Sequence, residues 1–357
     1  MLRRRTRQPS HSLYSNSELQ THLRELVAQS SHGRPARSPT NVERRQLPNC
    51  PQPNGQLKTI SAGPISTLTF QLNRSKSHSI STRLKITMTA PILPAFYISH
   101  GGGPWPWMAG PRHDTHRTLE AALQGLPLLV GAVPKAVLMV SAHWEEEDFT
   151  VMSHPNPPMV YDYYGFPDNT YQIQYAAPGA PKLAQRVQGL LQSAGIAARL
   201  DPARGFDHGT FVPMAVMYPD GSVPVVQLSL KRGLDPQDHL AAGRALATLR
   251  EEGVLIIGSG SSYHNLSMLG PESKAPSAAF DDWLQRTLDG THIADRAAAL
   301  AAWDAAPSAR MAHPREEHLL PLMVAVGAAE RDLATRFHHE DTFFGSASLS
   351  SFMFVAS

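Results

Sequence analysis

The sequence of 357 residues has a single cysteine, Cys50, which excludes an intrachain disulfide, a cysteine-ligated zinc finger and an iron–sulfur cluster. It also lacks any apolar run of the roughly 18 to 20 residues that a membrane-spanning helix needs, so no membrane partner is expected. Internal repeats are absent as well. The chain is 42% hydrophobic and 17% charged, which is typical of a globular protein with a sizeable core.

The small net charge of +2 averages two unlike parts of the chain. Residues 1–88 hold 14 of the 32 basic residues but 3 of the 30 acidic ones, which gives this segment a net charge of +11. The remaining residues, 89–357, have a net charge of −9. An acidic folded part argues against nucleic acid as its partner.

Residues 1–88 lack a sustained apolar period and are rich in Ser, Arg, Pro, Asn and Gln. Such a composition cannot bury enough apolar surface to fold alone, so we predict a basic, disordered N-terminal extension. It could be a transit peptide, an arm for nucleic acid or a membrane surface, or a stretch upstream of a working start at Met88. The last interpretation is favoured, because Met88 leads directly into the first predicted strand. We expect a cytoplasmic protein, or a mitochondrial one if residues 1–88 act as a transit peptide.

From Pro91 onward, strand-like and helix-like segments alternate. The predicted strands are short runs rich in Val, Ile or Leu, which is typical of strands buried on both faces; they cover 92–98, 136–141, 223–230 and 254–257. The predicted helices cover 181–194, 236–252, 278–288, 296–303 and 316–329. This alternation predicts one α/β domain over residues 89–357, with a central, mainly parallel or mixed sheet flanked by helices. The segment 153–178, dense in Tyr, Pro and Asn, is predicted to be a long loop.

Three histidines lie shortly after the ends of predicted strands: His100, His143 and His264. In open α/β sheets the ligand site lies beyond the carboxyl ends of the strands, so these imidazoles are expected to meet there. Three converging imidazoles suit zinc or non-haem iron and leave coordination positions open for a substrate. Each histidine taken alone is better explained as a structural residue, but the three together predict one mononuclear divalent metal, Zn²⁺ or Fe²⁺.

His208 follows Asp207 and precedes the apolar run 211–217. A carboxylate beside an imidazole can orient it and raise its pKa, which suits a proton-transfer group near neutral pH. The alternative is that Asp207 caps a helix and His208 faces solvent. Both interpretations fit the local sequence.

A further histidine, His318, lies at the start of the last predicted helix. His313 and His318 are five positions apart, which does not match the His-Glu-x-x-His spacing of zinc proteases. Glu316 and Glu317 would lie in the first turn of this helix, where carboxylates stabilise the helix dipole.

Five motifs occur in order along the chain: Ile-Ser-His100-Gly-Gly-Gly-Pro, Val-Ser-Ala-His143-Trp, Asp-His208-Gly-Thr-Phe-Val-Pro, Gly-Ser-Gly-x-x-x-His264-Asn-Leu and His313-Pro-x-x-Glu-His318-Leu-x-Pro-Leu. Together they resemble the DODA-type extradiol ring-opening dioxygenases, the 4,5-DOPA extradiol dioxygenase family within the class III, or LigB-type, extradiol group. The resemblance runs from about residue 91 to the C-terminus and covers none of residues 1–88.

The resemblance implies a mononuclear metal enzyme that opens a DOPA-like catechol ring with O₂ beside the hydroxyl pair. It implies that His100, His143 and His264 are the metal ligands. It further implies that His208 is an acid/base or an additional metal ligand, and that His318 is a catalytic residue near the substrate. The wider class holds Fe(II) with two histidines and a glutamate, whereas the third position here is His264, so Zn²⁺ and Fe²⁺ both stay open.

Two other functions fit the same residues. One is a zinc-dependent hydrolase in which His208 is the base for a metal-bound water, and it predicts activity with zinc alone and without oxygen. The other is a non-enzymatic metal-binding module, which predicts tight metal binding and no turnover of any catechol. The sequence identifies neither the catechol nor the oligomeric state, and no arginine stands out as the partner of a substrate carboxylate.

Overall fold

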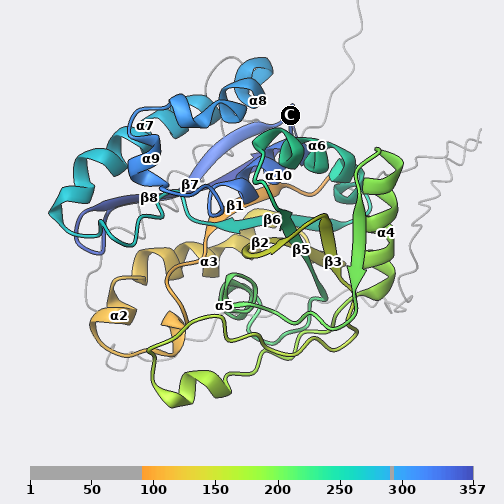
Figure 1. Cartoon of the computed structure of the whole chain (residues 1–357). Coiled ribbons are helices and arrows are strands. Elements are labelled where there is room, and N and C mark those ends of the chain that lie inside the picture. Colours follow the sequence, from red (N-terminus) through yellow and green to blue (C-terminus); the bar gives the residue numbers. More distant parts are fainter. Residues whose placement is uncertain (1–90, 290–292, 357) are drawn as a thin grey trace, which may run out of the picture. The chain divides into compact units, whose positions relative to one another are not determined.

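One eight-stranded mixed sheet organises the computed structural model, which describes residues 91–289 and 293–356 (Figure 1). The predictions for residues 1–88 lie outside the described residues. The strand order in the sheet is β4-β3-β5-β2-β6-β1-β8-β7. The strands are β1 Ala95–Ser99, β2 Ala136–Glu146, β3 Phe149–Met152, β4 Ala198–Asp201, β5 Val225–Lys231, β6 Val254–Gly260, β7 Leu333–Phe343 and β8 Ala347–Val355.

The four predicted strands form the parallel centre of the sheet, β5-β2-β6-β1. Antiparallel pairs lie at both margins, where β8 joins β1 and β3 joins β5. The predicted α/β domain with a mixed sheet is therefore confirmed. Because the central strands run parallel, their carboxyl ends share one edge of the sheet, and the loops that follow them meet there.

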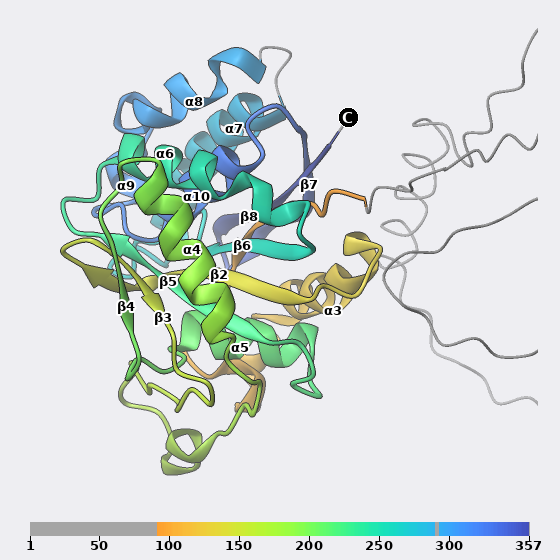
Figure 2. The same ribbon diagram turned by 90° about the vertical axis from the view of Figure 1, so that its right-hand side faces the viewer.

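Helices cover both faces of the sheet (Figure 2). Their bounds are α2 Pro111–Asp114, α3 Arg117–Val130, α4 Pro181–Ser193, α5 His208–Met217, α6 Pro236–Leu246, α7 Lys274–Asp289, α8 Ile293–Ala301, α9 Ala309–Ala312 and α10 Leu320–Ala328. Helices α4, α6 and α10 pack on one face, and α3 and α5 pack on the other. No helix within the two described ranges is both long and apolar enough to cross a membrane.

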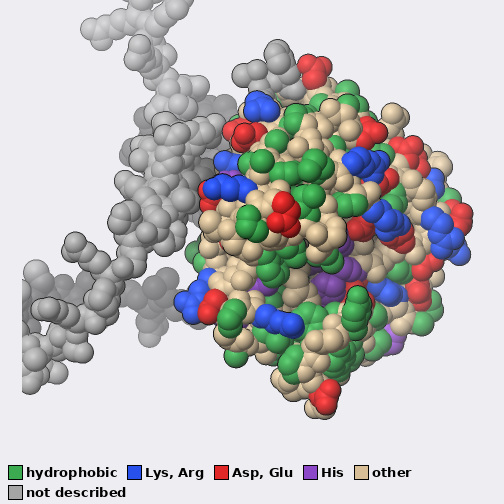
Figure 3. All heavy atoms as spheres, turned by 60° about the vertical axis from the view of Figure 1, so that its left-hand side comes forward, with side chains coloured by type: hydrophobic (Ala, Val, Ile, Leu, Met, Phe, Trp, Pro, Cys, Tyr) green, Lys and Arg blue, Asp and Glu red, His purple; other side chains and the backbone are tan. Residues whose placement is uncertain are grey.

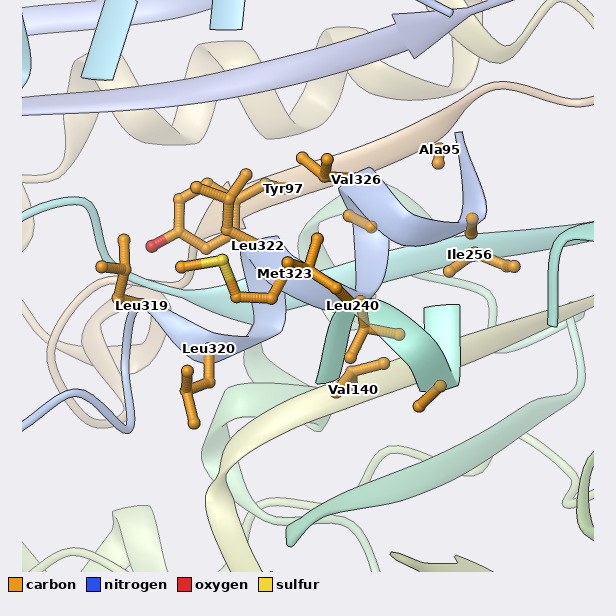
Figure 4. Close-up of a cluster of buried hydrophobic side chains, with 14 of the residues drawn as sticks. Ala95, Tyr97, Val140, Leu240, Ile256, Leu319, Leu320, Leu322, Met323 and Val326 are labelled. Atoms are coloured by element: carbon orange, nitrogen blue, oxygen red, sulfur yellow. The ribbon is translucent and has the colours of Figure 1, made fainter. Parts of the chain in front are cut away.

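Alternate residues of the central strands enter two separate cores. Tyr97, Val140 and Ile256 point toward α6 and α10, where they pack with Leu240 and Met323 (Figure 4). Strands that are apolar on both faces fit only between two helical layers, because each face needs an apolar partner.

The opposite face of the sheet carries the second core. Phe96 and Met139, the chain neighbours of residues in the first core, pack there with Leu119 of α3 and Phe211 of α5. Each of these side chains is fully buried. At roughly 1.5 to 3 kcal/mol for each large apolar side chain buried, these contacts fix the strands that position the site.

The last predicted helix begins later than the sequence pattern indicates. It was expected over 316–329, but α10 starts at Leu320, with Pro321 in its first turn. Proline suits the first turn because its missing N–H would have no partner there. Residues 316–319 therefore form the turn that enters the helix, and Glu316 and Glu317 do not lie in a first helical turn.

Candidate active site

A pocket of about 540 Å³ opens at the carboxyl edge of the central strands. Figure 3 shows histidine side chains (purple) together in a hollow of the surface. The pocket contains every histidine singled out from the sequence as a ligand or catalytic residue: His100, His143, His208, His264 and His318. Residues up to 218 positions apart in the chain thus reach one site.

His100 follows directly on β1, and a tight glycine loop fixes its ring. Its Nδ1 donates to the carbonyl oxygen of Gly101 at 2.8 Å, and Trp105 Nε1 donates to the His100 carbonyl oxygen at 2.8 Å. Gly101 has a φ of +78°, and a Cβ there would lie 2.5 Å from Trp105 Nε1, so only glycine fits. With Nδ1 engaged by a carbonyl, His100 presents Nε2 to the pocket.

His143 lies within β2, not after it as the strand prediction placed it. The pairing of β2 with β5 shifts register between Val140 and Glu145, and His143 falls in this irregular stretch. Its backbone N–H donates to Ser141 Oγ at 3.2 Å, and its Nδ1 is 3.3 Å from Asp162 Oδ2. Such an irregularity can redirect a side chain. Here it lies near the carboxyl end of β2, where His143 lines the pocket.

His208 is the first residue of α5, and the same carboxylate, Asp162, holds it. Asp162 Oδ1 accepts from His208 Nδ1 at 2.8 Å and from its backbone N–H at 3.0 Å. Partial burial works to raise the pKa of Asp162, but the hydrogen bond and charge of His208 outweigh this effect and lower it. Asp162 is a site residue that the sequence analysis missed, because no motif spacing connects it to a histidine.

Asp207 does not act as either sequence interpretation proposed. It stands at the N-cap position of α5, but its side chain makes no capping hydrogen bond. Its carboxylate instead accepts from Ser141 Oγ at 2.7 Å, from Arg204 Nη2 at 2.7 Å and from Gln227 Nε2. Burial raises the pKa of Asp207, and the nearby Asp162 charge raises it further. His208 is itself buried and does not face solvent.

A second carboxylate, Glu317, holds the other two histidines. Glu317 Oε1 accepts from His264 Nδ1 at 3.0 Å and from His318 Nδ1 at 2.9 Å. The two imidazole rings stack with their centroids 3.3 Å apart. Burial works to raise the pKa of Glu317, but the His264 hydrogen bond leads the interactions that lower it overall. Its role is therefore to orient two rings, which replaces the helix-dipole role expected from the sequence.

Glycine in β6 brings the His318 segment close to the sheet. A Cβ on Gly260 would lie 2.0 Å from the His318 carbonyl oxygen, a distance that backbone cannot tolerate. That oxygen accepts from Tyr97 Oη at 2.9 Å and from the backbone N–H of Ser261 at 3.0 Å. Strands β1 and β6 thus fix the backbone that carries Glu317 and His318.

The imidazoles crowd their Nε2 atoms together. His143 Nε2 is 3.2 Å from His100 Nε2 and 3.2 Å from His318 Nε2. In each of these rings Nδ1 faces an oxygen that can only accept, so in the neutral ring Nε2 carries a lone pair. Burial, followed by the neighbouring imidazoles, lowers the pKa of all three rings well below the usual value.

This crowding fits a metal ion, because lone pairs that face each other repel unless a cation lies between them. Two nitrogens bound at about 2.0–2.1 Å to one ion are roughly 2.9 to 3.4 Å apart for angles from right to tetrahedral, and 3.2 Å lies in this range. Within the described residues, two groups have ligand atoms close enough to share an ion: His100, His143 and His208, and His264, Glu317 and His318. The predicted ligands His100 and His143 thus fall in the first group, and His264 falls in the second. Carboxylate or carbonyl acceptors behind ligand histidines are the usual second layer of a metal site.

Aromatic side chains form much of the remaining wall. The predicted loop 153–178 contributes Tyr163, Tyr164 and Phe166, and the hairpin between β7 and β8 contributes Phe343 and Phe344. Burial raises the pKa of Tyr163 to about 12, so its phenol stays neutral at physiological pH. The pocket therefore suits an aromatic ligand that is held between flat apolar walls with polar atoms at one end.

Comparison with known proteins identifies the family of the chain. A family model described as the catalytic LigB subunit of aromatic ring-opening dioxygenase matches residues 94–353. A 4,5-DOPA dioxygenase extradiol of Beta vulgaris is 38% identical over 266 residues, which are 73% of this chain and 96% of the relative. A protein of the same name from Escherichia coli strain K12 is 33% identical over 271 residues, 74% of this chain and 96% of the relative.

A solved structure supports the match at the level of the fold. The crystal structure of an uncharacterised protein of Escherichia coli K12 aligns with a TM-score of 0.59 and 28% identity, over 73% of this chain and 99% of that one. The Beta vulgaris relative and this solved structure each match 73% of the chain. The chain belongs to the LigB family of aromatic ring-opening dioxygenases and is a DODA-type extradiol ring-cleavage enzyme.

Proposed function

We propose that this dioxygenase uses one divalent metal ion and O₂ to open the ring of a DOPA-like catechol beside its hydroxyl pair. The observation that carries the proposal is the position of His143 Nε2, 3.2 Å from His100 Nε2 and 3.2 Å from His318 Nε2, where facing lone pairs call for a cation. The aromatic walls support a planar substrate, and the similarity to proteins named 4,5-DOPA dioxygenase extradiol supports the choice of catechol. The product would be a muconic semialdehyde that contains both atoms of O₂.

His100, His143 and His264 are the proposed metal ligands, with His208 as either a fourth ligand or an acid/base. Each of these rings is held through Nδ1, by Gly101, Asp162 or Glu317, which leaves Nε2 for the ion. A bound Fe²⁺ would supply the one-electron exchange with O₂ that redox-inert Zn²⁺ lacks, so the active form is proposed to contain Fe²⁺.

His208 is the proposed proton-transfer group. Its Nδ1–H is donated to Asp162 Oδ1 at 2.8 Å, so the neutral ring has a free lone pair on Nε2 to accept a proton from a catechol hydroxyl. The Asp162 carboxylate then stabilises the imidazolium and keeps the ring oriented. His318, which Glu317 orients in the same way, is the second catalytic candidate beside the substrate. Tyr163 and Phe166 position the ring and reduce the access of water.

The test separates metal ligands from acid/base residues. Protein loaded anaerobically with Fe²⁺ should take up O₂ only when a catechol is added. His100→Gln, His143→Gln and His264→Gln should lose bound metal together with activity, as measured by elemental analysis and an oxygen electrode. His208→Gln should lose at least roughly 100-fold in kcat and, if His208 acts as an acid/base, should retain the metal.

His154→Gln is the matched control, because this histidine lies outside the pocket and binds the backbone N–H of Asn156. A His264→Gln variant with full metal content would contradict its role as a ligand. Activity with Zn²⁺ in the absence of oxygen would support a hydrolase, and metal binding without turnover of any catechol would support a non-enzymatic module.

A further inference from the structure

The pocket lining includes one guanidinium besides its histidines. Among the described residues that line it, Arg112 is the only arginine or lysine. No carboxylate of the described chain makes an ion pair with it within 4.0 Å, and the next acidic residue, Asp114, binds Arg117 Nη2 at 2.6 Å instead. The Arg112 guanidinium is therefore available to an anionic ligand.

Arg112 has a defined position relative to the histidine end of the pocket. Its carbonyl oxygen accepts from His116 Nδ1 at 2.8 Å, and His116 Nε2 accepts from the backbone N–H of Gly102 at 3.1 Å. The His116 ring also stacks on Trp105, with the centroids 5.0 Å apart and the planes within 3°. The backbone of Arg112 is thus connected through His116 to the loop that directly follows His100.

Phe166 lies between this loop and the guanidinium. A Cβ on Gly103 would lie 2.5 Å from Phe166 Cζ, so the ring of Phe166 rests against the glycine loop. The guanidinium carbon of Arg112 lies 5.2 Å from the centroid of the same ring. A guanidinium held over an aromatic face by a cation–π contact keeps its N–H fork free for a carboxylate, which it binds in a planar, bidentate manner.

We propose that Arg112 binds the side-chain carboxylate of the substrate and selects catechols with an anionic side chain over neutral or cationic ones. The inference rests on the proposed function, which places the catechol hydroxyls at the histidines. The lining of the pocket then runs from imidazoles, along aromatic walls, to one guanidinium, and a catechol amino acid has matching groups in the same order. Asp162 is the acidic residue among the described residues that line the pocket. Its carboxylate already contacts the imidazoles of His143 and His208, so it does not compete with a substrate carboxylate for Arg112.

The first experiment compares Arg112→Gln with the wild type on two catechols. L-DOPA and dopamine have the same ring and the same ammonium group, but only L-DOPA has a carboxylate. We expect Arg112→Gln to lower kcat/KM for L-DOPA roughly tenfold, mainly through KM, and to change kcat/KM for dopamine by less than about twofold. Arg117→Gln is the control, because Arg117 is an exposed neighbour that does not line the pocket.

A charge reversal makes the test sharper. Arg112→Glu should invert the preference toward dopamine, because its carboxylate attracts the ammonium and repels the substrate carboxylate. Equal losses on both substrates, or no loss on either, would overturn the assignment of Arg112. Melting temperatures of all variants should match that of the wild type, since Arg112 is exposed.

A binding measurement separates this inference from the proposed function. Calorimetric titration without O₂ gives the affinities of L-DOPA and dopamine even if neither is turned over. Tighter binding of L-DOPA that disappears in Arg112→Gln supports the carboxylate site whether or not the ring opens. Equal affinities of the wild type for the two catechols would overturn it, while absence of ring opening alone would count against the proposed function.

Discussion

At the scale of single residues, two carboxylates determine how the imidazoles are presented. Asp162 accepts from His208 Nδ1 and lies 3.3 Å from His143 Nδ1, and Glu317 accepts from the Nδ1 atoms of two other histidines. A carboxylate can accept from two N–H donors at once because its two oxygens offer several lone pairs. Each carboxylate thereby fixes two rings and directs their Nε2 atoms into the pocket.

Asp162→Asn tests this shared role with almost no change in volume. The amide offers one oxygen acceptor and one N–H₂ donor, so it cannot accept from both His143 and His208 while each keeps a proton on Nδ1. We expect a 10- to 100-fold loss of metal affinity or of kcat/KM, the effect typical of removing a partner behind a ligand histidine. Competition with a chelator and steady-state kinetics measure the two effects.

Asp168→Asn is the control for this substitution, because Asp168 is an exposed residue of the same loop and does not line the pocket. Wild-type metal affinity and kinetics in Asp162→Asn would show that ring orientation does not depend on the carboxylate.

The histidines could be predicted from the sequence, but their partners could not. His100, His143 and His264 occur in short motifs after apolar runs, so their place at the sheet edge follows from the strand pattern. Asp162 reaches His208 across 46 positions through a loop without a periodic pattern. Asp207 shows the converse, because it is next to His208 in the chain and yet binds Ser141, Arg204 and Gln227.

At the scale of elements, the central strands were predictable and the margins of the sheet were not. β1, β2, β5 and β6 are apolar on both faces, which makes them visible as continuous runs. β3 and β4 are only four residues long, too short for a pattern to be recognised. β7 is an edge strand with a mixed burial pattern that includes the polar stretch His338-His339-Glu340, and such charged edges prevent further strand pairing.

The hairpin between β7 and β8 contains a bulky residue in an unfavourable conformation. Phe344 has a φ of +48° and precedes Gly345, whose φ is +94°. Left-handed backbone costs a residue with a Cβ about 1 to 2 kcal/mol, and the turn with two positive φ angles prefers Asn-Gly. Phe344 nevertheless lines the pocket, with its ring 5.8 Å from that of His116.

Phe344→Asn should therefore separate stability from substrate binding. We expect the free energy of unfolding to rise by up to about 1 kcal/mol, because Asn tolerates the left-handed conformation. KM for the catechol should rise, because an aromatic wall is lost. Urea denaturation and steady-state kinetics provide the two values.

Phe344→Leu is the matched control for this prediction, since it removes the aromatic ring and keeps the backbone strain. It should raise KM without any gain in stability. A Phe344→Asn variant that is less stable than the wild type and has an unchanged KM would contradict both parts of the argument.

At the scale of the whole molecule, the site depends on most of the domain. Its histidines come from the end of β1, the irregular part of β2, the start of α5, the loop after β6 and the turn before α10. The sheet order places β1, β6 and β2 side by side, although β6 follows β2 by more than 100 residues. The class of fold could be deduced from alternating patterns, whereas this strand order depends on tertiary packing that no local pattern encodes.

Stability of the domain should depend on pH through a histidine that does not line the pocket. His239 on α6 is fully buried; its Nδ1 donates to the Asp235 carbonyl oxygen at 2.7 Å, and its Nε2 accepts from the Lys231 N–H at 3.2 Å. Both nitrogens are thus satisfied in the neutral ring only. Burial lowers the pKa of His239 to about 4, although the charges of Asp235 and Asp238 oppose this effect and that of Lys231 adds to it.

Because the folded pKa lies below the unfolded value near 6.5, the unfolded chain binds a proton first as the pH falls. The contribution of neutral His239 to the free energy of unfolding is complete above about pH 6.5. It decreases toward pH 4, by about 3 kcal/mol in total for a pKa shift of this size. His239→Gln removes this titration, so its free energy of unfolding should decrease less steeply between pH 7 and 4.5 than that of the wild type. Urea denaturation across this range gives the two slopes, and His154→Gln, a half-buried control outside the pocket, should keep the wild-type slope. Equal slopes for His239→Gln and the wild type would mean that His239 is protonated in the folded protein as readily as in the unfolded chain. That result would contradict the neutral ring inferred from its two hydrogen bonds.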